Sequence, residues 1–92
     1  MRKIINGKMY NTDTAEEICH FSSGQYGDFG YIRETLYKKK TGEFFLESYG
    51  GNLTSYQGET VIEPITEGEA KDFVERNGDV EKYIELFGEV EE

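Results

Sequence analysis

The residues with the clearest chemical potential are Cys19 and His20, the only cysteine and the only histidine among the 92 residues. A structural zinc site needs four nitrogen or sulfur ligands, and two neighbouring residues cannot supply them, although an acid such as Asp28 could in principle complete a mixed site. A cysteine nucleophile needs a histidine within reach and a third group to orient it. Adjacent residues on a helix point about 100° apart, so we expect no such pair. The sequence therefore predicts no metal site, no cofactor and no catalytic cysteine.

Carboxylates are the next candidates for chemistry, since the chain holds 19 Asp and Glu residues. Paired carboxyl groups can act as general acid and general base, but only where a pocket gives the two groups different environments. The sequence indicates no such pocket, and Glu residues at this density on helices usually face solvent. We therefore expect a protein that is not an enzyme.

Two short patterns could bind phosphate. Gly24, Gly27 and Gly30 recur every three residues, but the lysine and the strand-to-helix context of a phosphate-binding loop are missing. The three lysines at residues 38–40 form a basic run at an expected turn. We favour a solubilising turn that blocks edge-to-edge strand pairing over a phosphate contact.

The net charge of −9 is concentrated in the last third of the chain. Residues 1–58 hold seven acidic and seven basic residues, whereas residues 59–92 hold twelve acidic and three basic ones. A field of this sign repels nucleic acid and accelerates association with a cationic protein surface. Such carboxylates could imitate DNA phosphates in a basic groove, although many acidic faces only keep a protein soluble. The candidate acidic contact residues are Asp72, Glu75, Asp79, Glu81, Glu85 and Glu89.

Residues 34–49 carry the longest alternation of apolar and aromatic residues, and one Gly-containing turn interrupts it. This pattern predicts a β-hairpin. In the register that pairs Lys39 with Glu43, Leu36 lies opposite Leu46, and polar and aromatic side chains gather on the other face. A shift by one residue would exchange the faces, and the turn alone does not decide between the two registers. We favour the first register because it collects the aliphatic residues on one side. Because Tyr and Arg are frequent interface anchors, this polar-aromatic face is a second candidate partner-binding surface. Its residues are Tyr31, Arg33, Tyr37, Glu47 and Tyr49.

Turn and capping patterns place the other elements of the first two thirds. Asn-Gly at residues 6–7 predicts a type I′ turn in a small first hairpin over residues 2–11. The capping box from Thr14 to Glu17 predicts a helix over residues 15–21, with Cys19 towards the core. Two Gly-rich polar segments, residues 22–30 and 50–59, are expected to be loops.

The last third should contain one strand and two helices. The strand over residues 60–63 should end, or lie at a sheet edge, at Pro64. A capping box at residues 66–69 begins the first helix, and Gly78 suits a left-handed C-terminal cap. Asp79 caps the second helix, which Gly88 ends, and residues 89–92 form an acidic tail. The apolar face of the second helix is expected to comprise Val80, Tyr83, Ile84 and Phe87.

The expected fold class is α+β, with a single domain over residues 1–92. An antiparallel sheet of about four or five strands, built on hairpins, would pack against two or three short helices. A chain of this size buries one modest core, and thirteen Tyr and Phe residues should make that core aromatic. No signal-peptide pattern and no apolar run of about eighteen residues is present, so a cytoplasmic protein is expected.

Three segments resemble a family of small accessory proteins that phages and integrative elements of Gram-positive bacteria carry. These segments are KIINGKMYNTDTAEEI at residues 3–18, ETLYKKKTGEFFLESYGG at residues 34–51 and IEPITEGEAKDFVERNGDVEKYIELFGEV at residues 62–90. The most specific part is TLYKKKTGEFFL. The family loop after the Gly-Gly pair is longer and contains Trp, whereas this chain has a short loop and no Trp.

The resemblance implies a mobile-element setting in a bacterial cytoplasm, and it implies no reaction. Small acidic proteins in that setting are often inhibitors of host defence, including anti-CRISPR proteins that block Cas effectors. Cas nucleases hold nucleic acid in strongly positive channels. The expected function is therefore a non-enzymatic inhibitor that competes with nucleic acid for a basic surface of a host protein, without binding nucleic acid or a membrane itself. The alternative is a regulatory or replication accessory of the element with a protein-binding role.

Overall fold

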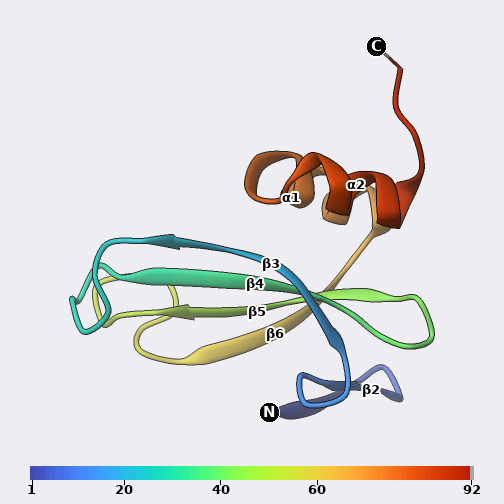
Figure 1. Ribbon diagram of the computed structural model, residues 1–92. Coiled ribbons are helices and arrows are strands. Elements are labelled where there is room, and N and C mark those ends of the chain that lie inside the picture. Colours follow the sequence, from blue (N-terminus) through green and yellow to red (C-terminus); the bar gives the residue numbers. More distant parts are fainter. Residues whose placement is uncertain (92) are drawn as a thin grey trace.

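The structure is a computed structural model that describes residues 1–91, and it contains two antiparallel sheets and two helices (Figure 1). A two-stranded sheet has the order β1-β2, and a four-stranded sheet has the order β3-β4-β5-β6. These findings confirm the predicted α+β class. The elements are β1 (Arg2–Ile5), β2 (Lys8–Asn11), β3 (Glu16–Ser23), β4 (Ile32–Lys38), β5 (Phe44–Gly50), β6 (Thr60–Ile65), α1 (Glu67–Asn77) and α2 (Val80–Phe87).

The central hairpin of β4 and β5 adopts the predicted register. Leu36 lies opposite Leu46 in the ladder. The amide of Lys39 donates a hydrogen bond to the carbonyl oxygen of Glu43 across 2.8 Å, which closes the turn. Because side chains alternate between the two faces of a strand, this register decides which residues meet the helices and which do not.

Residues 16–23 form the strand β3, so the prediction of a helix over residues 15–21 is wrong. β3 pairs antiparallel with β4, and the register shifts between Glu17 and Cys19. This bulge leaves Ile18 buried, while Cys19 also packs against the core on the helix side of the sheet. Because of the bulge, the neighbours Ile18 and Cys19 both face the same core, as adjacent residues on one face of a helix would.

The predicted capping box fails because Thr14 belongs to a turn. Its hydroxyl donates to the carbonyl oxygen of Asn11 (3.4 Å), and the amides of Thr14 and Ala15 bond to the same oxygen (3.3 and 3.1 Å). A helix of two turns is only marginally stable by itself. Pairing along β4 instead satisfies backbone groups over the length of β3 and outweighs the local preference.

The four-stranded sheet has a separate apolar cluster on each face. Figure 1 shows α1 and α2 above the sheet and the hairpin of β1 and β2 below it. The helix-side core comprises Ile18, Leu36, Phe44, Ala70, Phe73 and Val74. The cluster under the N-terminal hairpin comprises Tyr10, Tyr37, Phe45 and Ile62.

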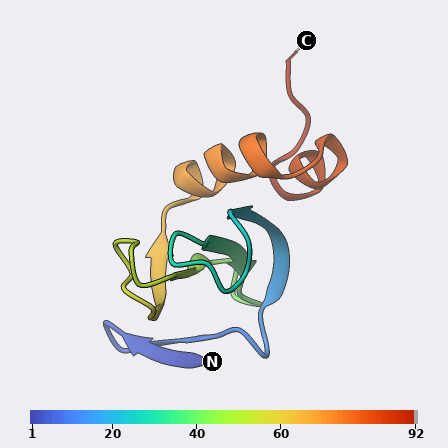
Figure 2. The same ribbon diagram turned by 90° about the vertical axis from the view of Figure 1, so that its left-hand side faces the viewer.

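The N-terminal hairpin turns at Asn6 and Gly7, whose φ angles of 52° and 77° fit the predicted type I′ turn. The hairpin supplies Tyr10, which packs against Phe45 of the sheet. The hairpin lies under the half of the sheet towards the turn between β4 and β5 (Figure 1), and the view along the strands shows it below the sheet (Figure 2). The rest of that face stays open.

β6 is an edge strand and contains Pro64, as predicted for a residue that cannot donate to a ladder. The capping box of α1 is also confirmed, because the Thr66 side chain accepts from the Glu69 amide and the Glu69 side chain accepts from the Thr66 amide. The Asp79 carboxylate caps α2 by accepting from the Lys82 amide across 2.7 Å. These local signals are therefore sufficient to begin both helices.

Gly78 does not form the left-handed cap that was predicted, because its φ is −99°. A side chain at Gly78 would not fit, because neighbouring residues occupy the space where its Cβ atom would lie. A Cβ atom at this position would lie 2.9 Å from Cγ1 of Val74 and 3.6 Å from Sγ of Cys19. A glycine therefore allows the turn between α1 and α2 to lie directly on the helix-side core.

α2 buries only part of its predicted apolar face. Tyr83 and Phe87 pack against the helix-side core. Val80 and Ile84 remain exposed, at 68% and 39% of their surface. Each pair has a spacing of four residues and forms a ridge along the helix. Only the ridge of Tyr83 and Phe87 contacts the sheet.

Candidate functional site

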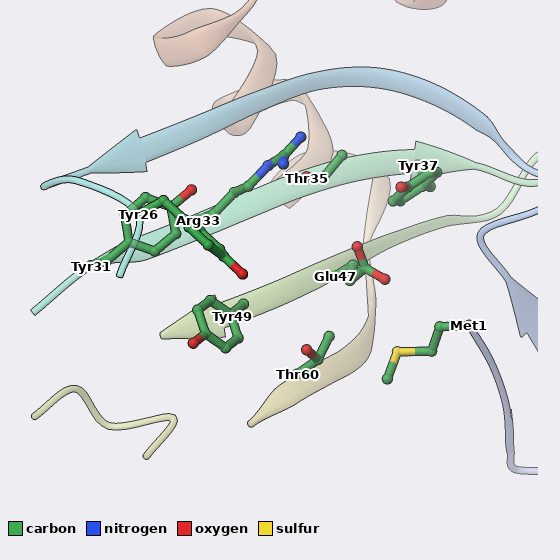
Figure 3. A pocket seen from close by; sticks show the side chains of 9 residues that line it. All are labelled: Met1, Tyr26, Tyr31, Arg33, Thr35, Tyr37, Glu47, Tyr49 and Thr60. Carbon is green, nitrogen blue, oxygen red and sulfur yellow. The ribbon is translucent and has the colours of Figure 1, made fainter. Parts of the chain in front are cut away.

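An open cleft lies on the part of the lower sheet face that the N-terminal hairpin leaves uncovered (Figure 3). Its volume is about 510 Å³, within the range of roughly 300 to 1,000 Å³ that is usual for small-molecule sites. All five residues of the predicted polar-aromatic face line it. The full lining is Met1, Tyr26, Tyr31, Arg33, Thr35, Tyr37, Glu47, Tyr49 and Thr60.

The strand register explains how the central residues of the cleft come together. Arg33 of β4 lies opposite Tyr49 of β5, and Thr35 lies opposite Glu47. Alternation then directs these four side chains to the same face of the sheet. The face is thus a consequence of the hairpin register, which explains why the sequence pattern could find it.

Four lining residues were not among the predicted site residues. Thr35 belongs to the central hairpin itself, and the other three come from other parts of the chain. Met1 precedes β1, Tyr26 lies between β3 and β4, and Thr60 begins β6. No local pattern links these positions to the central hairpin, since the link is made only by folding. The strand assignment of residues 60–63 was the one signal that could have placed Thr60 beside Tyr49, its partner in the ladder.

Three tyrosines gather at one end of the cleft, as Figure 3 shows. The rings of Tyr26 and Tyr31 meet edge to face with centroids 5.6 Å apart, and those of Tyr31 and Tyr49 lie 6.1 Å apart. Tyr31 is buried, whereas Tyr26 exposes 84% of its surface. This end of the cleft therefore offers aromatic rings and hydroxyl groups together, a combination that is common at interfaces.

The charged groups in the cleft have no ion-pair partners among the residues that the structure describes. Among residues 1–91, neither Arg33 nor Glu47 forms an ion pair, and the hydroxyls of Tyr31, Tyr37 and Tyr49 make no hydrogen bonds to other protein groups. A guanidinium offers five N–H donors and a carboxylate offers only acceptors. The cleft can therefore donate and accept hydrogen bonds towards a bound molecule.

Tyr37 lies at the other end of the cleft, stacked on Phe45 with ring centroids 5.2 Å apart. Burial raises the pKa of its phenol above the ordinary value, and the negative charges of Glu47 and Glu17 raise it further. The Tyr37 hydroxyl therefore stays protonated at neutral pH. It can act as a hydrogen-bond donor beside the carboxylate of Glu47 without itself carrying a charge.

The loops that connect β3 to β4 and β5 to β6 are bonded to each other at the tyrosine-rich end of the sheet. The amide of Gly51 donates to the Tyr31 carbonyl oxygen (2.8 Å), and that of Leu53 donates to the Phe29 carbonyl oxygen (3.0 Å). Phe29 and Leu53 are largely exposed. The backbone bonds position Tyr31 and so contribute to the shape of the cleft.

The predicted acidic contact residues are all exposed and lie on the helical layer or just after it. Two of them have internal roles: Glu85 pairs with Lys82 (3.2 Å), and Asp79 caps α2. The others form no ion pair among the residues that the structure describes. These are Asp72, Glu75, Glu81 and Glu89.

The acidic helices lie above the four-stranded sheet in Figure 1, whereas the side chains that line the cleft belong to the opposite face of that sheet. Leu36 and Tyr37 show the separation, because these neighbours in β4 belong to the helix-side core and to the cleft, respectively. One flat partner surface cannot contact both regions at once. The two predicted surfaces must therefore act separately, or against two walls of one groove.

Cys19 and His20 point to opposite faces of β3, since Cys19 pairs with Leu36 and His20 with Thr35. Cys19 packs against the helix-side core, the environment that was expected for it. Burial raises the pKa of its thiol, and the charges of Asp79 and Glu17 add to this effect. A thiol with a raised pKa is a poor nucleophile at neutral pH. Within residues 1–91, no three His, Cys, Asp or Glu side chains form a group that could hold a metal ion.

The basic run at the hairpin tip takes part in internal contacts. The Lys39 ammonium lies 4.4 Å from the ring centroid of Tyr10 and 3.6 Å from the Glu43 carboxylate. Glu43 also pairs with Lys8 (3.4 Å) and accepts a hydrogen bond from the Thr41 hydroxyl (2.8 Å). That hydrogen bond is the main cause of the lowered pKa of Glu43. Lys39 therefore links the hairpin tip to the N-terminal hairpin.

Comparison with known proteins found no significant match to a family model, a curated protein or a solved structure. Among residues 1–91, no helix is both long and apolar enough to cross a membrane. The fold and its surfaces describe a small antiparallel α+β protein, with a polar-aromatic cleft on one side of its main sheet and an acidic helical layer on the other.

Proposed function

We propose that this protein is a non-enzymatic inhibitor that binds the nucleic-acid-binding surface of a host protein in the bacterial cytoplasm. The observation that carries the proposal is the set of exposed carboxylates on the helical layer that lack an ion-pair partner among the described residues. Glu75 on α1 and Glu81 on α2 are the clearest examples. Unpaired carboxylates gain the most electrostatic stabilisation when a partner brings positive charges next to them. Their negative charge also raises the rate of association with such a partner.

The shape of the domain supports an inhibitor that enters a groove. Its extents are 41, 34 and 19 Å, so the domain is thin in one direction. A channel that holds nucleic acid has two walls. The acidic helices would face a basic wall, and the polar-aromatic cleft would contact the other through Tyr31, Arg33 and Tyr49. Nucleic acid would then be excluded both sterically and electrostatically.

A Cas effector is the first candidate target. The sequence resemblance to mobile-element accessory proteins suggests a setting in which host defence is inhibited, and Cas nucleases hold a nucleic-acid duplex in a positive channel. The test is co-purification of the protein with a panel of Cas effectors, followed by a DNA cleavage assay. We expect binding at micromolar protein and loss of cleavage. Failure to bind any of them would refute the Cas target.

Charge-reversed variants test the acidic surface itself. We expect Glu75→Lys combined with Glu81→Lys to slow association with the target, and more so at low salt, because long-range attraction is screened by ions. The matched control combines Glu59→Lys with Glu63→Lys, which makes the same change in net charge at exposed residues outside the helices. Equal on-rates for the two double variants would argue against a contact at the helices.

The cleft favours a second candidate function, a regulatory or replication accessory of a mobile element. Its lining holds one Arg and one Glu beside its tyrosines, so it could bind a protein partner that is not strongly basic. Comparing Arg33→Ala and Tyr49→Ala with the charge-reversed variants separates the two functions, because the inhibitor should be weakened by both sets. An accessory that binds through the cleft should lose its partner in these variants and keep it in the charge-reversed ones.

A further inference from the structure

A small groove lies at the turn between α1 and α2. It encloses about 300 Å³ beside the C-terminal segment of the chain. Apolar residues line most of it, and Glu75 and Asp79 are the only charged residues that line it among residues 1–91. The apolar lining comprises Val74, Gly78, Val80, Tyr83, Ile84 and Val90.

Three aliphatic side chains of this groove are exposed. Val80 exposes 68% of its surface, Val90 54% and Ile84 39%. α2 already contacts the sheet through Tyr83 and Phe87, so Val80 and Ile84 are not needed for that packing. Single exposed apolar residues are ordinary, whereas large apolar patches rimmed by polar residues mark interaction sites. Here the three side chains line one groove together.

The charges around the groove identify the chemistry of its occupant. The carboxylates of Glu75 and Asp79 line it, and Glu81 and Glu89 adjoin Val80 and Val90 in the chain. Within the described part of the chain, no Lys or Arg lines it. A second copy of the chain would bring like charges together and would carry the same net charge of −9. A partner with apolar and basic residues would satisfy both features.

We propose that this groove docks an amphipathic basic helix of the partner protein. The apolar side of that helix would cover Val80 and Ile84, while its Lys and Arg side chains would pair with Glu75 and the carboxylates beside it. Helices bind grooves in this way through anchors at i, i+3, i+4 and i+7. The inference rests on the proposed function, since it names the segment of the target that the acidic helical layer recognises.

Binding of two labelled model peptides, measured by fluorescence anisotropy at physiological salt, tests the proposal. One peptide contains Leu and Lys with leucines spaced to form one helical face, and the other has the same composition in an order that breaks the pattern. We expect the patterned peptide to bind about tenfold more tightly, because only it can bury its leucines in the groove. Equal affinities would overturn the proposal.

Two variants locate the binding site. We expect Val80→Ser combined with Ile84→Ser to remove the preference for the patterned peptide, while Leu53→Ser, which changes an 80% exposed residue outside the helices, should leave it intact. Both sites are exposed, so circular dichroism should show an unchanged fold. A preference that survives in Val80→Ser/Ile84→Ser would overturn the proposal. A dimer that forms in the free protein and disappears in that variant would overturn it as well, because a second copy of the chain would then occupy the groove.

Failure of this inference can be told apart from failure of the proposed function. If both peptides bind equally and Glu75→Lys with Glu81→Lys weakens both, the acidic surface recognises charge alone and the groove is not a docking site. If the patterned peptide binds the groove and no nucleic-acid-handling target is inhibited, the docking site stands and the inhibitor function fails.

Discussion

Tyr10 packs edge-on against Phe45, with ring centroids 5.5 Å apart and the ring planes at 75°. Phe45 is fully buried in the middle of the sheet, and Tyr10 comes from the separate N-terminal hairpin. This contact therefore attaches the hairpin to the sheet. It also limits how far the hairpin covers the lower face, which leaves the cleft open.

We expect Tyr10→Ala to destabilise the protein by about 3 kcal/mol, because it removes a buried ring and leaves a cavity beside Phe45. Urea unfolding would measure the loss. Phe29→Ala is the matched control, since Phe29 is another aromatic residue but exposes 62% of its surface. The free energy of unfolding of Phe29→Ala should differ from that of the wild type by no more than about 0.5 kcal/mol. Similar losses in the two variants would mean that the hairpin is not anchored through Tyr10.

Two threonines that begin similar sequence patterns should respond differently to substitution. Thr66 forms a true capping box on α1, so Thr66→Ala should cost about 1 kcal/mol of unfolding free energy. Thr14 precedes a strand and makes only an exposed turn contact, so Thr14→Ala should cost less than about 0.5 kcal/mol. Thermal or urea unfolding of both variants checks the difference. An equal or larger cost at Thr14 would support a helix over residues 15–21.

The stability of α1 should depend on acid pH through Glu69. The backbone amide of Thr66 and then its hydroxyl lower the pKa of the Glu69 carboxyl below its ordinary value of 4.5. The folded state therefore favours the carboxylate, and this stabilisation is present above the unfolded pKa. It is lost as the pH falls below about 4.5 and through the folded pKa.

Unfolding curves from neutral pH to acid pH would measure this dependence for the wild type and for Glu69→Gln. The glutamine variant retains a side-chain acceptor but cannot titrate, so its stability should fall less in the acid range. Glu59→Gln removes an exposed carboxyl outside the helices and is the control. Identical acid profiles for the wild type and Glu69→Gln would contradict the assigned role of the Glu69 charge.

Cys19 should react slowly with thiol reagents in the native protein. Its half-buried position and the raised pKa of its thiol both reduce the fraction of accessible thiolate at neutral pH. Alkylation by iodoacetamide, followed by mass spectrometry, should be much faster in urea than in buffer. A native rate that equals the rate in urea would show that the thiol is open to solvent. Cys19→Ser should leave partner binding unchanged.

The sequence predicted the parts of the fold that depend on neighbouring residues. The alternation on either side of the turn favoured the observed register of β4 and β5, because that register collects the aliphatic residues on one face, and the polar-aromatic face followed from it. Thr66 and Asp79 likewise marked the starts of both helices. Turns and caps involve hydrogen bonds over two to four residues, so the sequence contains nearly all the information they need.

The errors lie where distant segments compete with local preference. Residues 16–23 became a strand because β4 offered a ladder to pair with, and the bulge at Ile18 concealed the strand alternation. Val80 stayed exposed although it shares an apolar pattern with Tyr83, because the sheet contacts only one ridge of α2. A local pattern cannot indicate how much of an apolar face another element will cover.

The sequence by itself determined the net charge and its concentration in the last third, the central hairpin and both helix starts. Only the tertiary structure decided that Tyr26, Met1 and Thr60 complete the cleft, and that the cleft and the acidic helices lie on opposite sides of the sheet. Charge and capping are properties of single residues or short segments. Which faces of the sheet are covered depends on packing between segments far apart in the chain, where the burial of apolar surface outweighs local preference.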